Sequence, residues 1–208
     1  SMNAASLLLH VLLLLLMPPL LLGVINKTKA AFAGRLGAPL LQPYYDLVKL
    51  LRKGSVFSTT TTWVFRAGPV VTLAAVLVAA LLVPLGNHPA LISFNGDMIL
   101  FAYLFGLARF FTASAALDTG SAFEGMGAAR DVTFSCLVEP TLFFVLITLA
   151  RMSKSLSLTP MLTYPSLTVW LGAGATMLLL VGALFITLLA ENCRIPFDDP
   201  NTHLELTM

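Results

Sequence analysis

Residues 167–190, LTVWLGAGATMLLLVGALFITLLA, contain no charged side chain. At a rise of 1.5 Å per residue, a helix of about 20 apolar residues crosses the hydrocarbon core of a bilayer. Of all 208 residues, 58% are hydrophobic and 11% are charged, and the mean hydropathy is +0.90. Soluble domains carry about 25% charged residues. The stretch therefore predicts a transmembrane helix, and the composition predicts an integral membrane protein.

Four more apolar runs have the length of a membrane-spanning segment. Lipid leaves no partner for unpaired backbone groups, and the sequence shows no alternating pattern of about ten residues that would indicate barrel strands. We therefore expect an all-α integral membrane protein with about five transmembrane helices, forming one membrane domain over residues 1–208. The expected spans are 4–25, 68–85, 98–117, 132–150 and 167–190. Pro18 and Pro19 are expected to kink the first span.

The distribution of Lys and Arg predicts the orientation in the membrane. Seven of these residues lie in the connection 26–67, and none lies in the connection 86–97. Cytoplasmic connections carry the excess of basic residues, so we expect 26–67 to face the cytoplasm. Five alternating crossings then place 118–131 and 191–208 on the same side.

A further amphipathic helix is predicted within the first of these connections. In LLQPYYDLVKLLRK (residues 40–53), apolar residues recur at spacings of three and four, and a proline stands near the start. This pattern is typical of a helix that lies in the membrane interface. Its polar residues are candidates for contact with a soluble module: Asp46, Lys49, Arg52 and Lys53. A simple positive-inside anchor is the alternative, although it does not explain Asp46.

Two ionisable residues lie inside the expected spans. Arg109 lies about eight residues from the cytoplasmic end of the third span, and Glu139 lies about eight residues past the cytoplasmic start of the fourth. Both are therefore about 12 Å deep from the same side, so an ion pair between them is possible. Charges in spans are costly and often mark ion or proton pathways. The alternative is an ion pair that only fixes helix packing.

More acids and bases follow on the expected cytoplasmic side. The connection 118–131, DTGSAFEGMGAARD, contributes Asp118, Glu124, Arg130 and Asp131. The stretch AENCRIPFDDPNTHLEL (residues 190–206) contributes Glu191, Arg194, Asp198, Asp199, His203 and Glu205. Together with Arg109 and Glu139, they predict a proton relay from the membrane interior to the cytoplasm. A solvated loop is the alternative reading of 118–131.

Several other functions are excluded by the same sequence. A net charge of +2 without a basic, aromatic-rich stretch argues against nucleic-acid binding. Cys136 and Cys193 do not have the spacing of metal ligands, so we expect no metal or cofactor in this chain. The sequence shows no recognisable nucleotide-binding loop or Ser-His-Asp triad, so we also expect no catalytic residue.

Three motifs in chain order resemble those of complex I subunit 1. AENCRIPFDDPNTHLELTM (190–208) is similar to the loop of that family with Ala-Glu, Arg and Pro-Phe-Asp followed by acids. LLQPYYDLVKLL (40–51) is similar to the family's amphipathic helix, and GMGAAR (125–130) followed by Glu139 resembles its next conserved loop and helix. The family usually has about eight spans, so this chain resembles a member that lacks the last third.

The stretch ARFFTASAALDTGSAFEGMGAARD (108–131) narrows the resemblance to the formate hydrogenlyase branch, the membrane subunits of group 4 nickel-iron hydrogenases. This implies a multi-pass, non-catalytic subunit of an oxidoreductase complex in the cell (inner) membrane. Its partners would be the lipid bilayer, hydrogenase-like large and small soluble subunits, and antiporter-like membrane subunits. The nickel-iron centre and iron-sulfur clusters are expected in those partners.

Two alternatives to this function stay open. In one, the chain forms a quinone chamber, as the wider family implies. Asn201 and His203 stand where the quinone-reducing family tends to carry acids, which argues against quinone and suggests that His203 takes one acid's place in the relay. In the other, the chain is a passive membrane anchor for soluble subunits.

Overall fold

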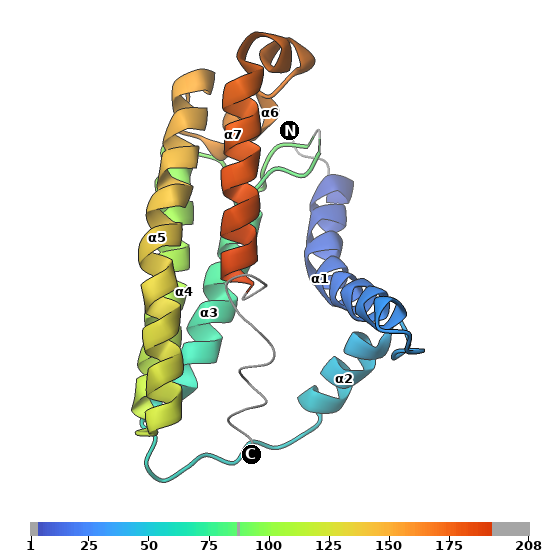
Figure 1. The fold of residues 1–208 in the computed structure, drawn as a ribbon, viewed down its shortest axis with the longest axis vertical. Helices are drawn as coiled ribbons and strands as arrows, with labels where there is room; N and C mark the ends of the chain where they lie inside the picture. The colour runs from blue at the N-terminus through green and yellow to red at the C-terminus, as the bar shows by residue number, and fades with distance from the viewer. Residues whose placement is uncertain (1–3, 87, 193–208) are drawn as a thin grey trace. The chain divides into compact units, whose positions relative to one another are not determined.

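The computed structural model describes residues 4–86 and 88–192. In this part of the chain, all regular secondary structure is helical, and strands are absent apart from an isolated bridge between Leu85 and His88 (Figure 1). The seven helices are α1 (Ala4–Phe32), α2 (Gln42–Leu51), α3 (Trp63–Leu81), α4 (Asp97–Asp118), α5 (Ala122–Ser153), α6 (Leu158–Thr163) and α7 (Leu167–Glu191).

Five of these helices, α1, α3, α4, α5 and α7, are long and apolar enough to cross a membrane. Each coincides with one expected span, so the predicted all-α membrane fold is confirmed. The chain divides into two compact units, residues 1–58 with α1 and α2, and residues 59–208 with the other five helices. One membrane domain over the whole chain, and its orientation, stay predictions.

The first unit is a pair of helices joined by polar contacts to backbone carbonyls. Helix α1 runs through Pro18 and Pro19, and its axis bends along its length (Figure 1). The Tyr44 hydroxyl of α2 donates to the Leu16 carbonyl, two residues before the proline pair. A Cβ at Gly23 would lie 2.0 Å from the Leu40 carbonyl oxygen, so the chain approaches α1 as closely as only glycine permits.

The predicted amphipathic helix is confirmed as α2, with its proline in the first turn. Every residue of α2 is at least partly exposed within its unit. Gln42 Nε2 donates to Asp46 Oδ1 over 2.9 Å, one helical turn along the polar side. The location of α2 at the membrane interface stays a prediction.

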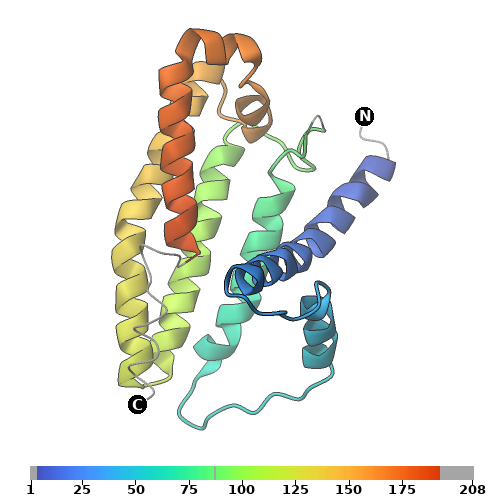
Figure 2. The same ribbon diagram turned by 45° about the vertical axis from the view of Figure 1, so that its right-hand side comes forward.

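The second unit is a bundle in which neighbouring helices follow the order α3, α4, α5 and α7 (Figures 1 and 2). Helices α3 and α4 make the closest approach, because a Cβ added at Gly68 would lie 2.8 Å from the Cβ of Ala115. Thr72 Oγ1 donates to the Ala108 carbonyl over 3.3 Å and lies 3.2 Å from Thr112 Oγ1. Small residues and interhelical hydroxyl bonds are the usual packing devices of membrane helices.

A fully buried acid stabilises the end of the bundle at which α4 begins. Asp97, at the start of α4, accepts hydrogen bonds from Leu158 N (2.7 Å), Ser157 Oγ (2.8 Å) and Phe94 N (3.3 Å). It therefore ties the start of α4 to the short helix α6. Beside it lies the apolar core, whose largest enclosed side chains include Leu82, Leu158 and Met161.

The expected connection 118–131 is wrong over most of its length, because α5 begins at Ala122. Ser121 precedes the helix and its hydroxyl donates to Glu124, the acid of the first turn. Ser and Glu three residues apart have the sequence spacing of a capping box, and here their two side chains bond to each other. The connection between α4 and α5 is therefore reduced to residues 119–121, with Gly120 at φ +69°.

The close approach of α3 and α4 predicts that Gly68→Ala lowers the free energy of unfolding by about 1 kcal/mol. Overpacking costs about 1–3 kcal/mol, and the higher helix propensity of alanine offsets about 1 kcal/mol of this. Unfolding can be followed by titrating the purified chain in mixed micelles with dodecyl sulfate.

The control is Gly106→Ala, because a Cβ at Gly106 meets no atom within 4 Å. Ala115→Gly removes the clashing methyl group and should make the double variant more stable than the sum of the two single effects. Equal stability of Gly68→Ala and Gly106→Ala would contradict the close packing of α3 against α4 at Gly68.

Candidate functional site: an arginine between two glutamates

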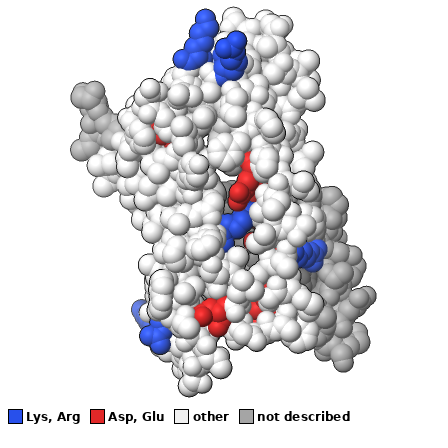
Figure 3. All heavy atoms as spheres, turned by 90° about the vertical axis from the view of Figure 1, so that its left-hand side faces the viewer, with Lys and Arg blue, Asp and Glu red and all other residues white. Residues whose placement is uncertain are grey.

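Arg109 binds two glutamates and a serine at the meeting point of three helices. Its Nη2 donates to both carboxylate oxygens of Glu191, over 2.5 and 2.6 Å. Its Nε lies 3.5 Å from Glu139 Oε1, and its Nη1 donates to Ser135 Oγ. We call these four residues the Arg109 cluster. Figure 3 shows acidic and basic atoms meeting in a hollow near mid-height of a face with few other charges.

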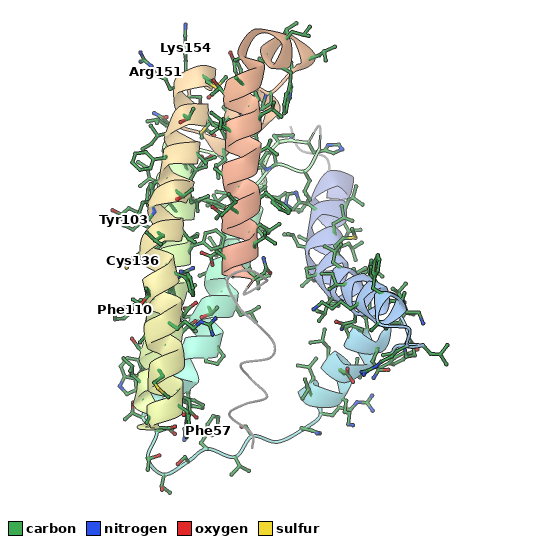
Figure 4. All side chains as sticks on the ribbon, viewed as in Figure 1. Phe57, Tyr103, Phe110, Cys136, Arg151 and Lys154 are labelled. Atoms are coloured by element: carbon green, nitrogen blue, oxygen red, sulfur yellow. The ribbon has the colours of Figure 1, made fainter. Side chains whose placement is uncertain are left out.

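The helices bring these side chains to one depth. Arg109 lies nine residues before the last residue of α4, or about 13 Å along the axis. Ser135 and Glu139 are four residues apart, and so share one face of α5. Tyr103 and Phe110 of α4 point outward, away from α7 (Figure 4), and each is more than 60% exposed. The Arg109 side chain, in contrast, is 15% exposed.

Glu191 was expected at the end of its span, which is correct, and below the intramembrane pair, which is wrong. It is the last residue of α7, and it contacts Arg109 directly. Helix α7 ends part-way along α4 and α5 (Figures 1 and 2). The guanidinium is a strong, fixed partner for a carboxylate, and binding it places the end of α7 at the depth of Arg109.

A cleft of about 320 Å³ lies between α4, α5 and α7 beside the cluster. Most of its walls are apolar: Phe101, Ala102, Phe105, Val138, Leu142, Phe143, Leu184 and Leu188. The polar lining consists of Arg109, Glu139, Thr187, Glu191 and Asn192. An apolar cleft with a few convergent polar groups has the general character of a functional site.

The cluster holds two carboxylates and one guanidinium, so one negative charge is not neutralised within it. Arg109 touches Glu191 through two short bonds and Glu139 through one longer contact. Glu139 is therefore the acid that is held less tightly, and its side chain is 41% exposed toward its surroundings.

Asp118 was predicted for the relay, but the structure places it at the start of α3. Its carboxylate accepts hydrogen bonds from Thr62 N (2.7 Å), Thr62 Oγ1 (2.8 Å) and Phe65 N (3.2 Å). These backbone groups belong to the first turn of α3, where amides have no intrahelical partner. Asp118 thus holds the start of α3 against the end of α4, outside the Arg109 cluster.

The structure places the other predicted relay residues of this region on the first turns of α5, where the Asp131 carbonyl accepts a hydrogen bond from Ser135 Oγ over 2.7 Å. Glu124 accepts from Ser121 at the start of α5, and Arg130 lies 5.9 Å from the ring centre of Phe134. Asp131 is exposed on the first turns of α5. The remaining predicted relay residues lie outside the described part of the chain: Arg194, Asp198, Asp199, His203 and Glu205.

The candidate interface residues belong to the first unit. Asp46 and Lys49 lie on α2, Arg52 and Lys53 follow directly, and all four are exposed within that unit. Their contact with a soluble module stays a prediction. In residues 4–86 and 88–192, no three His, Cys, Asp or Glu side chains are grouped to hold a metal ion.

Sequence reasoning missed three polar residues that the structure makes prominent. Ser135 could have been found because it lies one helical turn before Glu139. Asp97 had a weaker signal, an acid in the first turn of a span. Thr187, which lines the cleft, had no signal beyond its spacing of four residues from Glu191.

Comparison with known proteins identifies the family. Residues 4–208 match the family described as NADH dehydrogenase. The chain belongs to this family. Among its relatives, Hydrogenase-4 component C of Escherichia coli (strain K12) is 34% identical over 194 residues, 93% of this chain and 61% of that protein. Formate hydrogenlyase subunit 4 of the same organism is 38% identical over 148 residues, 71% of this chain and 48% of that protein.

The chain thus spans about half to three-fifths of the length of these two relatives. A solved structure of the membrane-bound sulfane sulfur reductase, an archaeal respiratory membrane complex, contains a similar chain with a TM-score of 0.73. The similarity covers 89% of this chain and 62% of that chain at 23% sequence identity, and it supports the fold.

The Arg109 cluster predicts energetic coupling between α4 and α7. Arg109→Gln should lower the free energy of unfolding by about 1–3 kcal/mol, less than for a fully buried pair because the glutamates are more than a third exposed. A double-mutant cycle with Glu191→Gln should give a coupling energy of at least about 0.5 kcal/mol, measured by dodecyl sulfate titration. Strictly additive effects would show that the two side chains do not interact.

The position of Asp118 predicts a structural effect. Asp118→Ala should lower the thermal unfolding midpoint, because three donors at the start of α3 lose their acceptor. Circular dichroism of the purified chain in detergent measures this midpoint. The control is Asp131→Ala, an exposed acid on α5. If both variants unfold at the same temperature, Asp118 does not cap α3.

Proposed function

We propose that this chain is a membrane subunit of an energy-converting complex of the hydrogenase type. In this proposal it links a soluble redox module to ion-translocating membrane subunits through a proton relay. The Arg109 cluster is the observation that carries the proposal, since it joins α4, α5 and α7 through charged groups about 13 Å from the end of α4. Charges at such depth commonly serve ion or proton pathways.

The chemistry of the relay follows from the unequal contacts of Arg109. Glu191 is held by two short bonds, and Glu139 by one contact of 3.5 Å. A negative charge that arrives near the end of α7 would draw Arg109 further toward α7 and away from Glu139. Glu139 would then lose its positively charged neighbour and take up a proton. When the charge leaves, Arg109 would return toward Glu139 and stabilise its ionised form, so Glu139 would release the proton.

The complex would supply the redox reaction. Hydrogenase-like large and small soluble subunits would hold the nickel-iron centre and iron-sulfur clusters, and antiporter-like membrane subunits would carry the ions. Acids and bases after α7, among them Asp198, Asp199 and His203, would receive the charge change, and α2 would contact the soluble module. The names of the two Escherichia coli relatives support this assignment. A subunit of such a complex would lie in the cell (inner) membrane.

A quinone chamber is the second candidate function. The aromatic and aliphatic walls of the cleft, with Phe101, Phe105 and Phe143, favour it, because an apolar headgroup could lie against them. Extraction of the purified complex with organic solvent decides between the candidates. Bound quinone in stoichiometric amount would support the chamber, and its absence would support the relay without quinone.

The relay predicts that Glu139→Gln in the assembled complex abolishes ion pumping, because the amide cannot bind and release the proton. Hydrogen evolution should continue, since the redox centres lie in other subunits. Both rates can be measured on the complex in proteoliposomes, pumping with a pH-sensitive dye and hydrogen with an electrode.

Glu124→Gln is the matched control, because Glu124 is an exposed acid on the same helix. Unchanged pumping in Glu139→Gln would contradict the proposed relay. If charge-neutral variants of Arg109, Glu139 and Glu191 all leave pumping and assembly intact, the chain is a passive anchor.

A further inference from the structure

The hydroxyl of Thr187 on α7 is a buried polar group that has no hydrogen-bond partner among the described residues. The residue is 8% exposed, and the part of the chain that the structure describes gives its Oγ1 no hydrogen bond. Other helical threonines of the bundle donate to the carbonyl four residues earlier: Thr112, Thr133, Thr141 and Thr148. This local bond is the usual solution for a hydroxyl in a membrane helix. The Thr187 hydroxyl does not form this local bond.

Thr187 lies one helical turn before Glu191, and both line the cleft between α4, α5 and α7. Glu139 lines the same cleft from α5. Thr187 therefore shares one cavity with the two acids of the Arg109 cluster. Its oxygen has less than 1 Å² of accessible surface, so a molecule in this cavity reaches it when the Thr187 side chain turns toward the cleft.

Leaving a buried hydroxyl unpaired is unfavourable, so such groups usually have a partner. A water molecule needs about 10–15 Å³ of accessible space and two to four polar partners to occupy an internal site. The cleft, at about 320 Å³, is large enough for several, although its apolar walls leave polar partners only around Thr187 and the cluster. The arrangement therefore favours a small polar ligand at that end.

We propose that Thr187 binds a water molecule that connects its hydroxyl with the carboxylates of the Arg109 cluster. The inference rests on the proposed proton relay and extends it by one residue. The water accepts a proton from the carboxyl group of Glu139 and releases another to the carboxylate of Glu191, so its composition does not change. Thr187 is a positioning residue, because it orients this water and does not exchange the proton itself.

Three variants of the assembled complex test the role of the hydroxyl. Thr187→Val keeps the shape and removes the hydroxyl, and Thr187→Ser keeps the hydroxyl. We expect Thr187→Val to lower ion pumping at least fivefold in proteoliposomes with hydrogen evolution unchanged, and Thr187→Ser to restore most of the pumping. The control is Thr141→Val, because the Thr141 hydroxyl already donates to Leu137 O and lies outside this cleft.

The water itself has a separate readout. Redox-induced infrared difference spectra of the complex, recorded in ordinary and in ¹⁸O-labelled water, identify water bands by their isotope shift. One such band should be present in the unaltered complex and in Thr187→Ser, and absent in Thr187→Val. Two results would overturn the proposal: the same bands in all variants, or equal loss of pumping in Thr187→Val and Thr187→Ser.

The Glu139→Gln variant separates this inference from the proposed function. If Glu139→Gln stops pumping and Thr187→Val pumps normally, the relay stands and the role of Thr187 is wrong. If Glu139→Gln pumps normally, the proposed relay is wrong, and the proposed water site at Thr187 is then wrong as well. A Thr187→Val complex that fails to assemble, beside a Thr187→Ser complex that assembles and does not pump, also overturns the proposal.

Discussion

A guanidinium cannot remain unpaired in an apolar bundle, and this constraint organises the centre of the second unit. Placing an arginine at the middle of a membrane helix costs at least about 2.5 kcal/mol, and more when it has no partner. Arg109 meets this cost by binding Glu191, Glu139 and Ser135 from two neighbouring helices. The depth of α7 follows from it, because the last residue of that helix must reach the guanidinium.

Polar side chains elsewhere in the bundle serve the fold. Asp118 holds the start of α3, and Asp97, fully buried, holds the start of α6. Each accepts bonds from backbone amides that a helix leaves unpaired, and this is a structural use of a carboxylate. The acids that bind backbone thus lie at the ends of the bundle, and the acids that bind Arg109 lie between them. This separation distinguishes the proposed relay from the scaffold around it.

The apolar runs predicted five spans because helix length and hydropathy are local properties, and α2 was predicted from its spacing for the same reason. Contact between Arg109 and Glu139 followed from their matching depths. The role of Asp118 could not be predicted, because its partners lie more than fifty residues earlier in the chain. The predicted depth of Glu191 was wrong because the end of its helix was assumed to coincide with the membrane surface. The spacing of Ser121 and Glu124 was a readable signal for a helix start within 118–131.

The position of the Arg109 cluster along α4 has an electrical consequence. A hydrocarbon core is about 30 Å thick, and the cluster lies about 13 Å from the end of its helix. If that end lies at the membrane surface, a charge that reaches the cluster through the apolar core crosses about two-fifths of the membrane potential, which is worth about 1 kcal/mol at 100 mV. In the proposed relay, the proton occupancy of the cluster would then change severalfold with the membrane voltage.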